Sequence, residues 1–309
     1  MDKNHIALAQ RAITNNQENI KIKFGKKHLK LGKLNVIYLN IISIRNKLDE
    51  LEEIIHETQN LNSKIIHLIV LTEARLNDED TKFYNLNNYT AFHCTRADGF
   101  GGVLLLVHES LTGNLIVKKS QSNVELLVVN ILELSLNIIV VYKQPPVCTD
   151  TLLSILIPLI ENRGKCIIIG DLNINLLSDS NTVNQYVNAF LSRGFSFLNK
   201  IEERFATRVA ERLINQRSIT SKTIIDHVIT NCINYSYIFS LIDIPISDHK
   251  LMSIAFDDCK KSNFLAIEKT VTVNVLNERN FNANLETMFS NPLYREEFTL
   301  SEFLHDLET

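Results

Sequence analysis

The chain has 309 residues, of which 45% are hydrophobic, so it can form one large domain with a substantial buried core. Its apolar runs, such as Leu152 to Ile160, are far shorter than the ~20 residues that a membrane-spanning helix needs, and the N-terminus lacks the apolar stretch of a secretory signal. The net charge is −3, and the five widely spaced cysteines include no Cys-x-x-Cys pair, so neither a disulfide framework nor a zinc site is indicated.

Between residues 34 and 257 the chain alternates apolar runs with polar loops. Residues 34–39 predict a first strand, and the helical spacing of apolar residues over 43–59 predicts a helix that begins with Ser43 as its N-cap. Ile65–Leu71 is a nearly continuous apolar run, which is typical of a strand buried on both faces. Further strands are expected at 102–107, 124–131, 136–142, 166–169, 223–230 and 251–256, and helices near 150–162 and 181–192. Many strands and few helices indicate stacked sheets.

The two ends of the chain differ in charge from this middle part. Residues 1–33 hold eight Lys or Arg against two acids, whereas residues 258–309 hold five against nine. A basic arm suits contact with a phosphate backbone, although a solvated, disordered arm explains the same charges at least as well. We therefore expect a basic N-terminal arm over 1–33, one catalytic-type domain over 34–257, and a polar, acidic C-terminal linker or tail over 258–309 with one helix near 300–307.

Acidic and amide side chains recur where the expected strands end. They are Asn40, Glu73, Asp171, Asn173, Asp226 and Asp248, the last followed by His249. Strand ends can meet at one edge of a sheet, and a hard cation such as Mg²⁺ binds a few carboxylate or amide oxygens, with water at its remaining positions. Each residue alone is weak evidence, because a Glu after a strand is usually solvated and an Asn there often forms a turn. The ordered set indicates a metal site suited to phosphate-ester chemistry.

Seven short motifs occur in the order found in a known family. They are Leu39–Lys47, Leu71-Thr72-Glu73, Gly101-Gly102-Val103, Val141-Tyr142, Gly170-Asp171-Leu172-Asn173, Ile225-Asp226-His227 and Ser247-Asp248-His249. Through these motifs the chain, over roughly 34–257, resembles the endonuclease/exonuclease/phosphatase superfamily, and within it the apurinic-type endonuclease domain of non-long-terminal-repeat retrotransposons. Gly-Asp-x-Asn followed by Ser-Asp-His is a specific combination.

Three positions depart from the family's pattern. Leu172 stands where the family usually has Phe, and Arg75 stands where it has Trp, although neither position is catalytic in the family. Lys143-Gln144-Pro145-Pro146 replaces a common Arg-Pro-Pro, which predicts a shifted surface loop with weaker substrate contact. The reverse transcriptase expected downstream in such elements is missing from this sequence. The resemblance is therefore to an isolated endonuclease module or to a truncated element product, with a reverse transcriptase module encoded elsewhere as the expected partner.

The resemblance implies a fold, an activity and a cofactor. The fold is α+β, a four-layer α/β/β/α sandwich with two packed mixed β-sheets. The activity is Mg²⁺-dependent hydrolysis of a DNA phosphodiester, with Mn²⁺ able to substitute, leaving a 3′-hydroxyl for reverse transcription at a retrotransposon target site. DNA is then the partner, no membrane is involved, and the expected location is intracellular and nuclear.

The resemblance also implies a role for each polar residue. Glu73 is the main Mg²⁺ ligand, helped by Asn40 and Asp248. Asp171 is the general base, already ionised at low pH, that orients or deprotonates the attacking water, and Asn173 hydrogen-bonds that nucleophile from the same side of the extended chain. The alternative for these last two residues is an Asx turn after a strand.

His249 is expected to donate to the scissile phosphate, with Asp226 orienting its ring and favouring its charged form. The alternative is a capped surface turn. Tyr142 resembles the family's active-site tyrosine, whose hydroxyl contacts the phosphate, although a core tyrosine fits almost equally well. His227 should point to the opposite face from Asp226 and is interpreted as structural.

Two other functions stay open on the sequence alone. The same superfamily cleaves phosphoinositides, sphingomyelin, RNA tails and abasic DNA with the same core residues, so another phosphoesterase is one alternative. The other is a catalytically decayed remnant that binds DNA or protein. The complete set of acids and amides argues against decay.

Overall fold

The computed structural model describes residues 32–80, 84–96, 98–161, 163–214, 217–232, 235–257 and 271–272. The expected arm before residue 32, the tail apart from 271–272, and the helix expected near 300–307 lie outside these residues. In the part of the chain that is described, no helix is long and apolar enough to cross a membrane. The four cysteines in this part carry free thiols, in line with their spacing.

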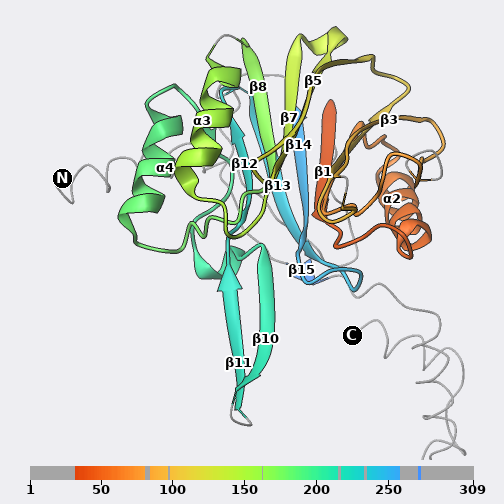
Figure 1. Cartoon of the computed structure of the whole chain (residues 1–309). Coiled ribbons are helices and arrows are strands. Elements are labelled where there is room, and N and C mark those ends of the chain that lie inside the picture. Colours follow the sequence, from red (N-terminus) through yellow and green to blue (C-terminus); the bar gives the residue numbers. More distant parts are fainter. Residues whose placement is uncertain are drawn as a thin grey trace, which may run out of the picture. The chain divides into compact units, whose positions relative to one another are not determined.

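Seven strands form the first sheet (Figure 1). In spatial order they are β15 (Val271–Thr272), β13 (Ser236–Asp243), β14 (Leu251–Asp257), β1 (Leu34–Asn40), β2 (Leu68–Thr72), β4 (Val103–His108) and β3 (Tyr89–Cys94). The sheet is mixed, because β1 runs parallel to β2 and β13 runs parallel to β15, whereas the other neighbours are antiparallel. Every residue of β1 and β2 is buried, as their apolar sequences predict for central strands.

Six strands form the second sheet. In spatial order they are β5 (Gly113–Gln121), β6 (Val124–Ile131), β7 (Leu136–Lys143), β8 (Lys165–Asp171), β12 (Asp226–Thr230) and β9 (Ser196–Phe197). This sheet is also mixed, since β7 and β8 are parallel and the other pairs are antiparallel. The edge strand β5 is mostly exposed and carries Lys118 and Lys119, charges that discourage pairing with another edge.

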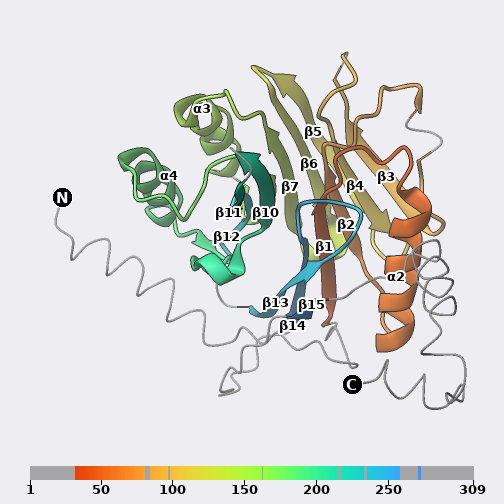
Figure 2. The same ribbon diagram turned by 90° about the horizontal axis from the view of Figure 1, so that it is seen from below.

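Helices cover the outer face of each sheet (Figure 2). They are α2 (Leu48–Asn62), α3 (Thr149–Ile160) and α4 (Asn181–Leu191), with short 3-10 helices at Leu132–Leu134 and Glu203–Phe205. Leu51 of α2 packs on the first sheet, and Leu156 and Phe190 of α3 and α4 pack on the second. A separate apolar core, which includes Val70 and Val140, lies between the inner faces. The expected four-layer α/β/β/α sandwich is confirmed.

The first helix begins later than predicted. Ser43 is not its N-cap, because Lys47 occupies that position, and Ile42 and Ser43 have φ angles of 46° and 83°, outside the region of a right-handed helix. The amide of Ser43 instead donates to the carbonyl of Glu73 (N···O 2.7 Å), which ties this stretch to the exit of β2. α2 therefore starts only at Leu48.

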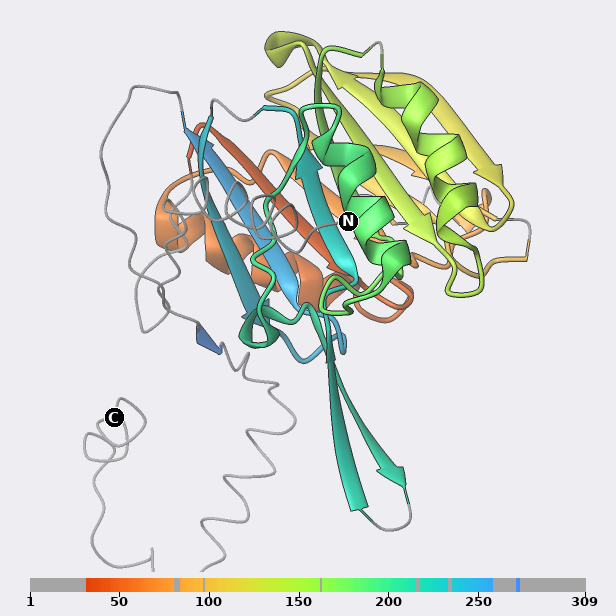
Figure 3. The ribbon, with the colours of Figure 1, turned by 90° about the vertical axis from the view of Figure 1, so that its left-hand side faces the viewer.

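The apolar pattern does not predict β3, β5, β13 or the hairpin formed by β10 (Arg208–Ile214) and β11 (Arg217–Thr223). β3 and β5 are only partly buried, and the hairpin is a separate two-stranded sheet, so no long apolar run marks them. The hairpin projects away from the two main sheets (Figure 3). Its first residue, Arg208, forms an antiparallel bridge with His249, so the hairpin begins beside a predicted site residue.

Candidate active site

Four polar residues from separate motifs meet at one edge of the sandwich. Asn40 ends β1 and Glu73 follows β2, its parallel neighbour. Asp171 ends β8 and pairs in register with Asp226, the first residue of antiparallel β12. The Asn40 Nδ2 donates to Glu73 Oε1 (3.0 Å) and to Asp171 Oδ2 (2.8 Å). One amide therefore joins acids that come from different sheets.

The backbone around Glu73 holds this acid in an unusual conformation. Its φ of 49° lies in the left-handed region, which is unfavourable for a residue with a side chain. The next two amides, of Ala74 and Arg75, donate to the carbonyls of Gly102 (3.3 Å) and Gly101 (2.9 Å). Arg75 also donates through Nη2 to Glu73 Oε2 (3.0 Å). The residue that replaces the family's Trp thus contacts the expected metal ligand.

A row of polar residues crosses the second sheet at the same edge. Register pairs join Glu125 of β6 to Tyr142 of β7, Tyr142 to Asp171, and Asp171 to Asp226. Directly paired residues point to the same face of a sheet, and here it is the inner face, because Tyr142 belongs to the core between the sheets. Burial, followed by the neighbouring Glu73 charge, raises the pKa of Tyr142. Tyr142 therefore belongs to the core between the sheets and also lies beside Glu73, so its position is compatible with both interpretations.

Asp226 is fully buried, and both of its carboxylate oxygens are hydrogen-bonded. The Tyr38 hydroxyl donates to Oδ1 (2.6 Å), and His249 Nδ1 lies 2.8 Å from Oδ2. Burial of His249 opposes its charged form, but the neighbouring carboxylates, Asp226 above all, outweigh burial and raise the pKa of His249. The expected contact between Asp226 and His249 is thus present in the structure, and it leaves Nε2 of the ring on the opposite side.

Asp171 is part of a turn and part of the site at the same time. Its Oδ1 accepts a hydrogen bond from the Asn173 amide (3.0 Å), which is the Asx turn considered above, and its Oδ2 faces Asn40. The Asn173 side chain donates to the Lys143 carbonyl (2.8 Å). Burial, then the Asp226 charge, raises the pKa of Asp171. Without a bound cation, the expectation that Asp171 ionises at low pH is wrong, because burial disfavours its charged form. The sequence motif does not reveal this burial.

Asp248 lies at the rim of this cluster. Its side chain is 34% exposed, and its Oδ2 accepts a hydrogen bond from Arg208 Nε (2.8 Å) at the base of the hairpin. Its Oδ1 is 4.0 Å from His249 Nε2. Of the three expected metal ligands, Glu73 and Asn40 are hydrogen-bonded to each other, whereas Asp248 lies next to His249.

His227 points away from these residues, as its register predicts. Its Nδ1 lies 2.8 Å from the Tyr186 hydroxyl, and its Nε2 lies 2.9 Å from the Ile174 carbonyl. The ring packs against Tyr186 and Phe197 on the helix-covered side of the second sheet. Burial lowers the pKa of His227 to about 4, which keeps it neutral.

The donor set at this edge fits a hard divalent cation. Asp171, Asp226 and His249 each offer a ligand atom within 4.8 Å of the others, and Glu73 and Asn40 adjoin Asp171. Carboxylate and amide oxygens are the ligands that Mg²⁺ prefers. Glu73 and Asp171 share the Asn40 amide and repel each other, so a cation bound beside them would reduce this repulsion.

Motif reasoning misses three residues of this edge, namely Tyr38, Thr72 and Glu125. The Tyr38 hydroxyl contacts Thr72 Oγ1 (2.8 Å) as well as Asp226. Tyr38 precedes Asn40 by two positions on one strand and so shares its face, which is a signal that the sequence contains. Glu125 stands inside an apolar strand, where a completely buried acid is unusual.

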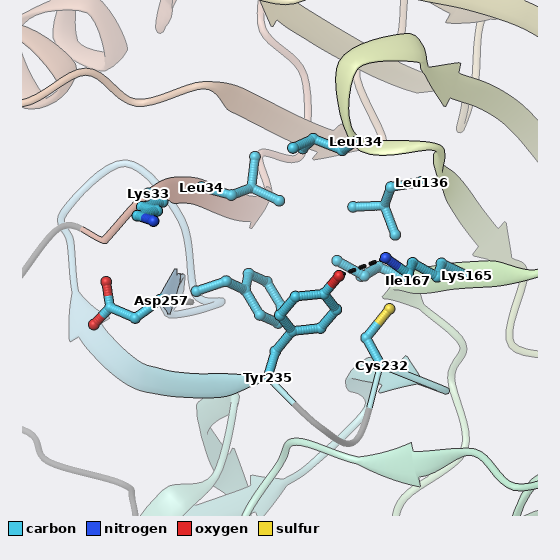
Figure 4. Close-up of a pocket in the computed structure, with 10 residues that line it drawn as sticks. Lys33, Leu34, Leu134, Leu136, Lys165, Ile167, Cys232, Tyr235 and Asp257 are labelled. Atoms are coloured by element: carbon cyan, nitrogen blue, oxygen red, sulfur yellow. Dashed lines mark hydrogen bonds between the residues drawn. The ribbon is translucent and has the colours of Figure 1, made fainter. Parts of the chain in front are cut away.

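A separate pocket of about 160 Å³ lies at the other end of the strands (Figure 4). Leu34 and Lys165, which line it, are the first residues of β1 and β8, whereas the site residues end those strands. Its lining is mainly apolar, and Lys165 Nζ donates to the Tyr235 hydroxyl (2.7 Å). This pocket is distinct from the acidic cluster.

Comparison with known families assigns the chain. The profile of the Endonuclease/Exonuclease/phosphatase family matches residues 43–249, a range that contains Glu73, Asp171, Asp226 and His249. The chain belongs to this family. Enzymes of the endonuclease/exonuclease/phosphatase family are hydrolases that include enzymes acting on nucleic acids, and the buried acidic cluster lies within the matched range. Comparison with curated protein sequences gives no match.

Solved structures of nucleic-acid enzymes share the fold. The endonuclease domain of TRAS1, a telomere-specific non-LTR retrotransposon, is 16% identical with a TM-score of 0.52, over 72% of this chain and 98% of that domain. A 3′ phosphatase, NExo from Neisseria, bound to a product DNA hairpin, is 14% identical with a TM-score of 0.52, over 72% and 99%. An AP endonuclease from Archaeoglobus fulgidus is 13% identical with a TM-score of 0.52, over 72% and 99%. The family predicted from the motifs is confirmed, and its retrotransposon branch provides one structure with the same fold.

Proposed function

We propose that this protein is a divalent-metal-dependent DNA endonuclease that hydrolyses a phosphodiester and leaves a 3′-hydroxyl. The observation that carries the proposal is the Asn40 amide bound to both Glu73 and Asp171, beside the paired Asp226 and His249. This arrangement combines an oxygen-rich place for a cation with a charged hydrogen-bond donor. The DNA-bound Neisseria phosphatase and the Archaeoglobus endonuclease, which share the fold, support a nucleic-acid substrate.

The acids and amides have two roles, in metal binding and in activation of the attacking water. Glu73 and Asn40, with Asp248 at the rim, would hold Mg²⁺ or Mn²⁺, which when bound screens the phosphate charge and stabilises the leaving oxygen. Asp171 in its ionised form takes a proton from the attacking water, and Asn173 lies next to it to orient that water. Because burial raises the pKa of Asp171, this role needs positive charge nearby.

The other two side chains act on the phosphate. His249 Nδ1 donates to the Asp226 carboxylate, so Nε2, which lies 4.0 Å from Asp248 Oδ1, carries the hydrogen that can be donated to a non-bridging phosphate oxygen. Burial and the Glu73 charge raise the pKa of Tyr142, so its hydroxyl stays protonated and can donate to the phosphate once a bound cation offsets the Glu73 charge. Asp226 orients the His249 donor before substrate binds, which favours stabilisation of the transition state.

The hairpin supports a duplex rather than a small substrate. Residues 208–223 contain four basic residues and one acid, and the base of the hairpin contacts Asp248 through Arg208. Positive charge on an element that projects from the site suits contact with a phosphate backbone. Target-site nicking for a retrotransposon, a reverse transcriptase encoded elsewhere and a nuclear location are the corresponding biological proposals.

A decayed module that binds DNA without cutting it is the second candidate. Arg75 favours it, because its guanidinium occupies Glu73 Oε2 and brings a positive charge to the expected metal ligand. Another phosphoesterase of the family is the remaining alternative.

A nicking assay on supercoiled plasmid tests these functions. We expect nicking with Mg²⁺ or Mn²⁺, none in chelator, and nicks that a DNA polymerase extends without end repair. Glu73→Gln and Asp171→Asn should lower the rate by roughly 10²–10⁴-fold, whereas Glu79→Gln, an exposed acid on the same loop, should not. Equal cleavage in chelator would reject the metal mechanism, and DNA binding without any nicking would favour the decayed module.

A further inference from the structure

Glu125 is a buried acid that the proposed chemistry does not use. Its side chain is 0% exposed, and among the described residues neither carboxylate oxygen has a hydrogen bond of ordinary geometry. Its nearest charge is Arg96, whose Nε lies 3.6 Å from Oε1. Burial raises the pKa of Glu125 to about 7, although Arg96 and the Gly102 amide lower it. A buried acid with so few partners costs stability, so its presence requires another explanation.

The position of Glu125 suggests what that explanation is. Glu125 belongs to the second sheet, where it pairs with Tyr142, whereas Arg96 lies between β3 and β4 of the first sheet. The charge pair therefore joins the two sheets at the edge that carries the acidic cluster. Glu125 is the fourth member of the row of paired residues that continues through Tyr142 to Asp171 and Asp226.

The segment that carries Arg96 also holds Glu73. The carbonyls of Gly101 and Gly102 accept the amides of Arg75 and Ala74, next to Glu73. Gly101 packs tightly on the pair, because a Cβ there would lie 3.0 Å from Glu125 Oε2 and 3.0 Å from Tyr142 Cε1. One short segment therefore contacts the charge pair, the tyrosine and the backbone of the expected metal ligand.

We propose that Glu125 and Arg96 are positioning residues that fix Tyr142 and Glu73 relative to each other across the two sheets. The proposal rests on the endonuclease function, because it assigns Glu73 and Tyr142 to the reaction. Through this pair and the packing of Gly101 against it, the Glu73 loop of the first sheet and Tyr142 of the second sheet keep a fixed separation. Errors of about 1 Å in such geometry are costly to catalysis.

An ordinary stabilising ion pair is the competing explanation, and Glu125→Gln separates the two. The amide has nearly the same shape, and Arg96 keeps Asp98 as a partner for its charge. Removing the buried charge should therefore leave the melting temperature unchanged or raised. A positioning role predicts that kcat for plasmid nicking falls at least ~10-fold while KM for DNA stays within about twofold.

Hydrogen exchange supplies a measurement that needs neither metal nor substrate. In Glu125→Gln the amides of Ala74 and Arg75 should exchange faster than in the wild type, because the segment that accepts them is released. Glu161→Gln, which breaks the exposed pair with Arg193, is the control and should change none of these quantities. Arg96→Gln is the second variant, and the double variant should be no worse than the more impaired single one.

The two proposals fail in different ways. If the wild type cleaves no phosphoester, the endonuclease function is rejected. Hydrogen exchange at the amides of residues 74 and 75 then decides by itself whether the Glu125–Arg96 pair fixes the segment that carries Arg96. If the wild type nicks DNA and Glu125→Gln keeps its kcat and its protection, the positioning role is overturned. A lowered melting temperature with a proportional loss of activity also overturns it, since the pair would then only stabilise the fold.

Discussion

His227 is a neutral imidazole enclosed by the protein. Its Nε2 faces the carbonyls of Ile174 (2.9 Å) and Ile224 (3.2 Å) and therefore carries the hydrogen, while Nδ1 accepts from the Tyr186 hydroxyl. Burial lowers the pKa of His227 to about 4, below the ~6.5 of the unfolded chain. Between these two values the unfolded chain binds a proton that the folded protein does not.

The free energy of unfolding should therefore fall as the pH falls through about 6.5 toward 4. The loss attributable to His227 is about 2 kcal/mol by pH 5 and ~3 kcal/mol once the pH is below 4. Urea unfolding at pH 7 and pH 5 measures it, with His227→Gln as the reference. The variant will be less stable at pH 7, but its loss on acidification should be smaller by this amount. An equal loss in both proteins would contradict a depressed His227 pKa.

Asp226 acts on two groups in the same direction. Its charge raises the pKa of Asp171 and, more than any other favourable contact, that of His249. In the proposed mechanism the rate needs Asp171 ionised and His249 protonated, so the pH–rate profile should be bell-shaped with apparent pKa values that belong to the whole cluster. Asp226→Asn should move both limbs to lower pH, because repulsion on Asp171 and attraction on His249 are lost together.

Nicking rates at saturating Mn²⁺ across a pH series check this expectation. His249→Ala should remove the alkaline limb and most of the rate, and combining it with Asp226→Asn should add little, because the two residues act as a unit. Simple additivity, or a shift of the alkaline limb to higher pH, would break the assignment of the pair.

The β10–β11 hairpin is the element that we propose to contact duplex DNA. Replacing residues 209–222 by a short glycine-containing turn keeps Arg208 and Thr223, which pair at the base. Nicking of plasmid should weaken through a higher KM and a shallower salt dependence, since phosphate contacts are lost. Hydrolysis of a small chromogenic phosphodiester should be unchanged. If both activities fall alike, the hairpin supports the site itself rather than the duplex.

Element boundaries show the limits of local patterns. Buried strands such as β1 and β7 follow from apolar runs alone, because a strand covered on both faces needs apolar residues at successive positions. The start of α2 does not follow from the local pattern, because the backbone amide of Ser43 donates to the carbonyl of Glu73, which lies after a different strand. Helical spacing is a local signal, whereas this competing hydrogen bond joins residues that are far apart in the sequence.

At the scale of the whole molecule, the sandwich is nearly complete by the end of β14 at Asp257. The strand beyond it, β15, adds only two register pairs at the edge of the first sheet, Ile242 with Val271 and Asp243 with Thr272. A chain that ends at Asp257 but keeps its N-terminal residues should therefore melt cooperatively and nick plasmid like the full chain. Circular dichroism on heating and the nicking assay check both points. A broad, non-cooperative transition in the shorter chain would mean that the tail contributes to the core.

Whereas the fold class comes from the resemblance of the motifs to a family, local patterns in the chain are sufficient for most buried strands and for the identity of the polar residues at their ends. Each of these depends on neighbouring positions, such as an apolar run that stops at Asn40 or a turn that begins at Asp171. Contacts between the sheets depend instead on register and packing over long distances along the chain. The Asn40–Asp171 hydrogen bond spans 131 positions, and the partners of Glu125 and the ionisation of Asp171 follow from burial between two sheets. No stretch of sequence contains these contacts, because they arise only when separate strands bring their ends to one edge.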